Sequence, residues 1–218
     1  VVRVIDEQPI VLRLARGLAP CGLAHLEAWA SSTNVAIPAI LAVGGQQKCA
    51  PAIWTGTQAI LSQHIGDMDD RETRKVLTDA VQDLQRLYRC DCSAIAHDLH
   101  PDYFTTRRAQ PARETAYQVQ HHHAHAVACM IEHGLLDETV LAVIFDGTGF
   151  GTDGTVWGGE IMQATIADFR RIASLDLFAL PGGEAVIREP SRIALSLLAE
   201  TFGPKEIPTW LLDRLGLA

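Results

Sequence analysis

Four histidines fall within residues 121–125 (HHHAH), a spacing that suits metal binding. The apolar run that follows favours a helix from about residue 120 to His133, stopping at Gly134, a residue suited to a left-handed helix cap. Residues four apart share one face of a helix, so His121 and His125 can direct both imidazoles at one cation. His122 with His125, three residues apart, is the competing pair.

This histidine cluster has two other interpretations. A solvated or hydrogen-bonded run of histidines without a ligand is the first alternative. A zinc peptidase is the second, but its HExxH motif requires a glutamate directly after the first ligand as the general base. His122 occupies that position here, so the hydrolytic interpretation lacks its base.

A glycine-rich segment, residues 142–160 (AVIFDGTGFGTDGTVWGGE), supplies the second chemical feature. Its acid at a strand end can ligate a metal, and its glycines allow the backbone to approach a phosphate closely. The segment lacks the Gly-Lys-Ser/Thr ending of a Walker loop. We therefore predict a metal site of His121, His125 and Asp146, and a nucleotide site formed by Asp146, Gly147, Thr148, Gly149, Gly151, Gly158, Gly159 and Glu160. Two imidazoles and a carboxylate accept zinc, iron or magnesium.

Weaker signals come from two segments that follow predicted strands. One segment contains His64 and Asp67, and the other contains Asp98 and His100. With Lys48, in a turn between strands, these residues are possible substrate contacts. Each has a plainer interpretation: a helix cap for Asp67, an exposed turn for Lys48 and a solvated loop for the histidines. We find no Ser/His/Asp or Cys/His pair, so no catalytic residue is assigned.

Composition narrows the classes of protein. The chain has 218 residues, 48% of them hydrophobic, and a formal charge of −8 without a long basic run, which argues against a nucleic-acid surface. No apolar stretch reaches the roughly 18–20 residues of a membrane span. The five cysteines form an odd set without a CxxC pair, typical of reduced thiols in the cytoplasm.

The patterning predicts an α/β architecture with a mixed sheet. A hairpin is expected within residues 37–62, an amphipathic helix over 67–89, and a short strand over 93–97. A second hairpin joins residues 139–145 to 157–165 through Asp153-Gly154, and a last helix covers about 190–200. Residues 21–36 are weakly patterned and are predicted to be a linker.

Several of these stretches resemble the HypF family, the maturation factors of nickel-iron hydrogenases, in its C-terminal carbamoyltransferase module. The matching segments are ILSQHIGDMDD (60–70), AIAHDLHPDYFTT (94–106), VQHHHAHAVA (119–128), FDGTGFGTDGTVWGGE (145–160) and LPGGEAVIREPSRIA (180–194). Residues 1–20 are similar to the end of the nucleotide-binding, YrdC-like domain that precedes this module. The resemblance thus assigns residues 37–218 to the N-terminal part of the module.

The resemblance implies an actin-like, sugar-kinase-like ATPase fold with a ribonuclease H-like lobe. It implies that carbamoyl phosphate and ATP give carbamoyl adenylate, and that the carbamoyl group passes to the C-terminal cysteine of a HypE-like partner as the precursor of a cyanide ligand. The HxxxH pair of the family falls on His121 and His125, and its loop aspartate on Asp146. A further aspartate ligand is expected from a second lobe beyond residue 218.

One departure from the family pattern and three rival interpretations of the function remain open. The family commonly has GG-x-LKNT where this chain has residues 44–50 (GGQQKCA), which leaves the role of Lys48 undecided. A related carbamoyl or threonylcarbamoyl transferase acting on tRNA or a small-molecule hydroxyl is the first rival. A sugar or acetate kinase on the same fold is the second, although it has no use for His121 and His125. A noncatalytic metal-binding domain is a third interpretation.

Overall fold

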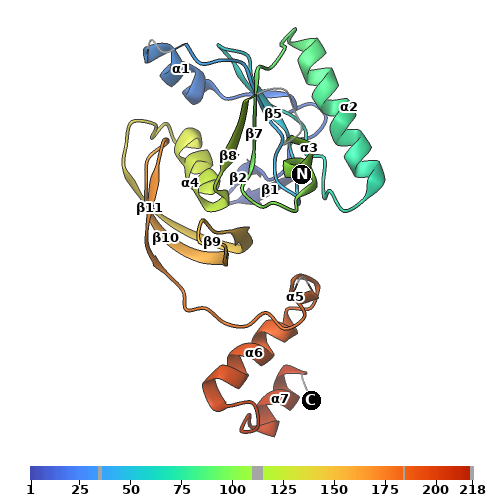
Figure 1. Ribbon diagram of the computed structural model, residues 1–218, viewed down its shortest axis with the longest axis vertical. Coiled ribbons are helices and arrows are strands. Elements are labelled where there is room, and N and C mark those ends of the chain that lie inside the picture. The colour runs from blue at the N-terminus through green and yellow to red at the C-terminus, as the bar shows by residue number, and fades with distance from the viewer. Residues whose placement is uncertain (34–35, 110–114, 184, 217–218) are drawn as a thin grey trace. The chain divides into compact units, whose positions relative to one another are not determined.

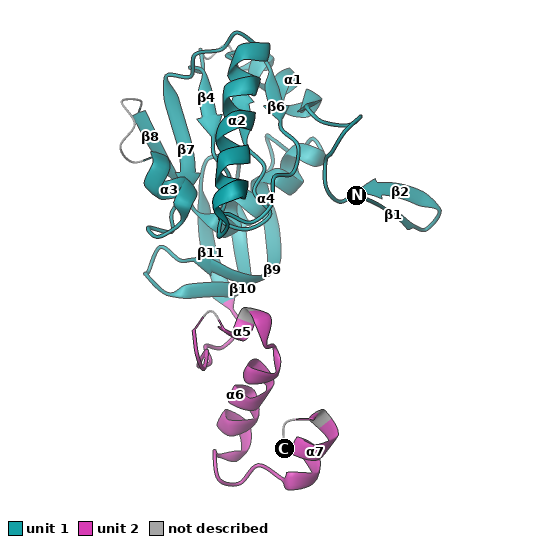
Figure 2. Ribbon diagram, turned by 90° about the vertical axis from the view of Figure 1, so that its right-hand side faces the viewer, with its two compact units in different colours: residues 1–173 teal, residues 174–218 magenta. Residues whose placement is uncertain are grey.

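The computed structural model describes residues 1–33, 36–109, 115–183 and 185–216, which fall into two compact units. The first unit spans residues 1–173 and holds both large sheets, while the second spans residues 174–218 (Figure 2). Its described residues form the helices α5 (Ala185–Arg188), α6 (Ser191–Phe202) and α7 (Thr209–Leu215). The predicted helix over 190–200 corresponds to α6 and is confirmed.

A six-stranded mixed sheet is the frame of the first unit. In spatial order its strands are β3 (Cys21–Gly22), β6 (Ala59–Leu61), β5 (Ala52–Trp54), β4 (Ile40–Ala42), β7 (Ala94–Asp98) and β8 (Thr115–Val119). The expected hairpin is confirmed, since β4 and β5 pair antiparallel with Ile40 opposite Trp54. On its other edge β4 runs parallel to β7, and β7 runs parallel to β8. The carboxyl ends of β4, β7 and β8 therefore lie at one edge, where α/β proteins place ligands.

The second sheet contains, in spatial order, β11 (Phe169–Ser174), β10 (Val156–Ala164) and β9 (Val140–Phe150), and β9 and β10 pair antiparallel. The hairpin predicted around Asp153-Gly154 is confirmed, with Ile144 opposite Glu160 and Gly154 at a φ of 78°. The glycine-rich segment after Asp146 is a continuation of β9 and not a loop, which corrects the expectation of a strand end at Asp146. An irregularity between Trp157 and Gly159 accommodates this long pairing.

Four helices accompany the sheets: α1 (Ala24–Ser32), α2 (Arg71–Leu87), α3 (Phe104–Ala109) and α4 (His121–Glu132). Figure 1 shows α2 and α4 on opposite faces of the six-stranded sheet. The helix predicted over 67–89 begins later, because the Asp70 side chain caps α2 by accepting hydrogen bonds from the backbone N–H groups of Glu72 and Thr73. The predicted stop of α4 is confirmed, with Gly134 at a φ of 68°.

Apolar packing fixes α4 against the second sheet. Ala126 of α4 is buried with Ile144 of β9 and with Trp157 and Met162 of β10. The six-stranded sheet is covered by a different helix: Leu84 of α2 packs with Ile53 and Ile60 of that sheet. Each such fully buried aliphatic side chain contributes about 1.5–3 kcal/mol. The helix that carries the histidines thus packs against the second sheet, and Figure 1 places it on one face of the six-stranded sheet.

The linker predicted over residues 21–36 is corrected by the structure. Within it β3 pairs antiparallel with β6, and α1 follows. The glutamate of α1, Glu27, accepts a hydrogen bond from the backbone of Ala59 and so ties the helix to the sheet. Residues 34 and 35 lie outside the described residues. Before this segment, β1 (Val2–Ile5) and β2 (Gln8–Val11) form a two-stranded hairpin. Among the described residues no helix combines the length and apolarity needed to cross a membrane.

Candidate metal centre

Two elements, α4 and β9, bring together one cluster of side chains. The first turns of α4 present His121 and His125 on one face, as the four-residue spacing predicts, and β9 brings Asp146 opposite them. The N-terminus of α4 is held by Gln120, whose Oε1 accepts the backbone N–H of His123 at 2.7 Å. The Nε2 of the same amide donates to the carbonyl of Phe150 on β9 at 3.2 Å. One side chain therefore fixes the start of the helix to the strand that carries Asp146.

The three ligand atoms form a nearly equilateral triangle. His121 Nε2 lies 3.0 Å from Asp146 Oδ2, His125 Nε2 lies 3.4 Å from the same oxygen, and the two Nε2 atoms are 3.2 Å apart. Ligands at 2.0–2.1 Å around a tetrahedral ion are separated by roughly 3.3 Å, so the triangle matches one face of such an ion. The pair His121 and His125, rather than His122 and His125, is thereby brought together with Asp146.

The hydrogen bonding of this triangle also fits a cation. Asp146 Oδ1 accepts the backbone N–H of Gly147 at 2.7 Å, whereas Oδ2 is buried and has no hydrogen bond of good geometry among the described residues. An oxygen with free lone pairs beside two imidazole nitrogens is a suitable donor set for zinc or iron, and its carboxylate is also suitable for magnesium.

A second carboxylate lies behind His121. Asp98, the last residue of β7, places Oδ2 at 2.7 Å from His121 Nδ1 and accepts the backbone N–H of His100 through Oδ1. Metal-binding histidines commonly donate their second ring nitrogen to a carboxylate in this way. Asp98 was predicted as a possible substrate contact, and the structure places it against His121, one of the three proposed ligands.

The charges in the cluster are strongly coupled. The neighbouring carboxylates, Asp146 first and Asp98 second, raise the pKa of His121 to about 9. The imidazoles of His121 and His125 hold the pKa of Asp146 far below its usual range. Burial lowers the pKa of His122, whose side chain is fully buried beside the cluster. Without a cation, a proton on His121 balances the two carboxylates, and a bound cation would replace that proton.

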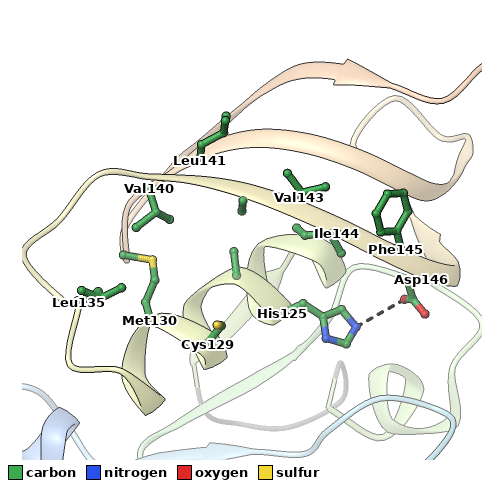
Figure 3. Close-up of a pocket in the computed structure, with 12 residues that line it drawn as sticks. His125, Cys129, Met130, Leu135, Val140, Leu141, Val143, Ile144, Phe145 and Asp146 are labelled. Carbon is green, nitrogen blue, oxygen red and sulfur yellow. Dashed lines mark ion pairs between the residues drawn. The ribbon is translucent and has the colours of Figure 1, made fainter.

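An apolar groove opens beside the triangle. It has a volume of about 480 Å³ and runs between α4 and β9, with His125 and Asp146 at one end (Figure 3). The apolar lining residues labelled there are Cys129, Met130, Leu135, Val140, Leu141, Val143, Ile144 and Phe145. The solvent-facing side of β9 is unusually apolar, since Phe145 is 78% exposed beside Asp146.

The residues predicted to hold a nucleotide have different surroundings. A Cβ on Gly147 would meet nothing within 4 Å, so the backbone there is open to a ligand. A Cβ on Gly149 would strike the imidazole of His122, one on Gly151 the indole of Trp157, and one on Gly158 the carbonyl of Asp146. These three glycines therefore allow close packing within the protein. Thr148 and Gly159 lie in the paired strands β9 and β10.

Glu160, predicted as part of the nucleotide site, is buried and has partners within the protein. Its side chain is 2% exposed, pairs with Arg171 at 2.5 Å and accepts the backbone N–H of Gly158. Arg171 also lies over the Trp157 ring, 4.2 Å from its centroid. Glu160 alternates with the buried Met162 and Ala164 along β10, and this period of two in the sequence marks an inward position.

Among the other predicted substrate contacts, only His100 has a described contact that places it near the cluster: its backbone N–H donates to Asp98 Oδ1. The His100 ring stacks on Tyr103 and meets Phe150 of β9 edge-on, 5.1 Å away. Lys48 is exposed at a φ of 51°, and its backbone N–H donates to Asp67 Oδ1 at 2.8 Å, so Asp67 shapes a turn. The backbone N–H of His64 donates to Leu14 near the N-terminal hairpin.

The fold and the site place the chain in the Kae1-like class of the actin-like ATPase fold. The family model described as "HypF Kae1-like domain" matches residues 36–132, and "Carbamoyltransferase, Kae1-like Domain, second subdomain" matches residues 142–214. The chain belongs to the HypF family.

Relatives and solved structures agree with this assignment. The chain is 41% identical over 203 residues to "Carbamoyltransferase HypF" of Synechocystis sp., covering 93% of this chain and 26% of that protein. It is 30% identical over 211 residues to "Probable carbamoyltransferase HypF" of Methanocaldococcus jannaschii, covering 93% and 26%. The chain thus spans about a quarter of the length of these curated relatives.

Two crystal structures are similar along nearly the whole chain. The HypF of T. kodakarensis superposes with a TM-score of 0.81 at 29% identity, covering 98% of this chain and 27% of that one. A full-length HypF described as in "the phosphate- and nucleotide-bound form" gives a TM-score of 0.80 at 33% identity, covering 98% and 34%.

Proposed function

We propose that the protein carrying this chain is a carbamoyltransferase of nickel-iron hydrogenase maturation. It takes the carbamoyl group from carbamoyl adenylate, made from carbamoyl phosphate and ATP, and transfers it to the C-terminal cysteine of a HypE-like acceptor, as the precursor of a cyanide ligand. The triangle of His121, His125 and Asp146, in a chain whose relatives are named carbamoyltransferases, is the observation that carries this proposal. The place of action is the cytoplasm, where thiols stay reduced.

Different residues bind the cation and the phosphate. His121, His125 and Asp146 hold a divalent cation, which when bound neutralises charge on the adenylate phosphate. The open backbone at Gly147 approaches that phosphate closely, in the manner of a glycine-rich anion site. The full-length HypF crystallised with phosphate and a nucleotide supports a nucleotide-bound state for this family.

The transfer step requires no nucleophile from this chain. The acceptor thiolate forms a carbon–sulfur bond to the carbamoyl carbonyl carbon, the carbon–oxygen bond to the phosphate breaks, and AMP leaves with the electron pair. The residues around Asp146 hold the leaving phosphate while the carbonyl carbon stays open to the acceptor. The product is a thiocarbamate on the acceptor's terminal cysteine.

Labelled transfer tests the proposal. With ¹⁴C-carbamoyl phosphate, ATP and a HypE-like acceptor, we expect label on the acceptor and none on its Cys→Ser variant. The double variant His121→Ala/His125→Ala should lose both bound metal and transfer. Full transfer by the double variant would refute the role of the triangle, and labelling of tRNA or a small-molecule hydroxyl instead would favour the first rival function.

A further inference from the structure

The carboxylate of Asp98 is held rigidly although it comes from an element that carries none of the three ligand residues. Its side chain is 7% exposed, and Oδ1 accepts the backbone N–H of His100 at 2.8 Å. Its backbone carbonyl accepts the hydroxyl of Thr106 at 3.0 Å. With one oxygen anchored, Oδ2 has a fixed direction toward His121 Nδ1 at 2.7 Å.

An ionised carboxylate can only accept hydrogen bonds, which determines the state of the ring it faces. His121 Nδ1 must carry a hydrogen to make the contact with Asp98. In the neutral imidazole the lone pair then lies on Nε2, the atom that faces Asp146 and His125 at 3.0 and 3.2 Å. The opposite tautomer would turn a hydrogen toward the cation site.

We propose that Asp98 is a positioning residue that fixes the tautomer and ring orientation of His121, so that Nε2 points into the metal triangle. This inference rests on the metal site in the proposed function. It assigns to Asp98 a role in metal affinity through His121 and no contact with the cation or the substrate. Outer-shell partners of this kind typically affect metal affinity by about 10- to 100-fold.

Zinc titration of the protein against a competing chelator tests the inference. Asp98→Asn keeps the size of the side chain, but its amide can rotate and donate to Nδ1, which favours the wrong tautomer. We expect zinc affinity to fall about 10- to 100-fold. The matched control is Asp102→Asn, which removes the same charge four residues further on, at a side chain that is 69% exposed and pairs with Arg107. Its zinc affinity should equal that of the wild type.

Nitrogen-15 spectra of the histidine rings separate positioning from general stability. In the zinc-loaded wild type, we expect His121 to coordinate through Nε2 and to retain a hydrogen on Nδ1. This measurement tests the role of Asp98 even if Asp98→Asn does not fold. Coordination through Nδ1, or unchanged zinc affinity in folded Asp98→Asn, would overturn the role of Asp98 and leave the metal site standing. Absence of zinc binding by the wild type would remove the metal site itself.

Discussion

Two glycines of β9, Gly147 and Gly149, lie close to the metal triangle in very different surroundings. A Cβ at position 149 would lie 2.5 Å from Cε1 of His122 and 2.9 Å from Cδ2 of His121. His122 is fully buried, so its ring has no room to yield. At position 147 a Cβ meets nothing within 4 Å. The absence of a side chain therefore serves packing at one position and leaves open backbone at the other.

Alanine at each glycine separates these two roles. Gly149→Ala should displace the His121 ring and lower zinc affinity by about 10-fold or more, as loss of a supporting contact does. Gly147→Ala should keep the fold and the zinc affinity of the wild type but reduce carbamoyl transfer, because a methyl group would obstruct approach of the phosphate. Zinc titration and the transfer assay are run on both variants. Equal zinc affinity in wild type and Gly149→Ala would show that the imidazoles adjust freely.

Residue types alone indicated the three residues of the proposed metal site but not the residues that support them. His121 and His125 follow from helical spacing, and Asp146 from the glycine-rich segment that follows it. The contact between Asp98 and His121 depends on where β7 ends relative to α4, which no local pattern contains. The buried position of Glu160 was not predicted, because the neighbouring glycines suggested a loop, whereas strand pairing turns its side chain inward.

At the scale of the element, α2 shows how an N-terminal cap adds pH-dependent stability. Hydrogen bonds from Thr73, first from its hydroxyl and then from its backbone N–H, and one from Glu72 lower the pKa of Asp70. A carboxyl group whose pKa is lower in the folded state stabilises the fold above its unfolded pKa of about 3.9. This contribution is lost as the pH falls through the folded pKa.

Replacing this cap should destabilise the protein in a pH-dependent way. Asp70→Ala removes the acceptor for two backbone N–H groups, so we expect a lower melting temperature at pH 7 and a difference from wild type that shrinks below about pH 4. Asp79→Ala removes an exposed carboxylate from the middle of the same helix and should cause no such loss. Thermal denaturation from pH 3 to 7 measures both. A pH-independent difference would assign the effect of Asp70 to something other than its charge.

The elements themselves were largely predictable, because their patterns are local. Both hairpins and the helices α2, α4 and α6 follow from the spacing of apolar residues and from turn or cap residues. The linker prediction over residues 21–36 was wrong because β3 is only two residues long and α1 has no fully buried side chain, so neither leaves a strong pattern.

Considered as a whole molecule, the first unit has α4 packed against the second sheet, and the proposed cation would join α4 to β9. A ligand that binds only the folded state stabilises it by about 2.7 kcal/mol at 100 times its Kd. Zinc should therefore raise the temperature at which the first unit unfolds, and a chelator should reverse the rise. Calorimetry of the wild type and of His121→Ala/His125→Ala tests this. The same rise in the double variant would mean that zinc binds elsewhere.

All three proposed ligand residues lie on two consecutive elements, with a short turn between α4 and β9. Closing so short a span costs little chain entropy, and the contacts of Gln120 and Ala126 already align the helix with the strand. We therefore expect the ion to be captured as soon as these two elements meet on the ribosome, well before an acceptor tail is delivered. The metal would then bind during synthesis of the protein and not during each catalytic cycle.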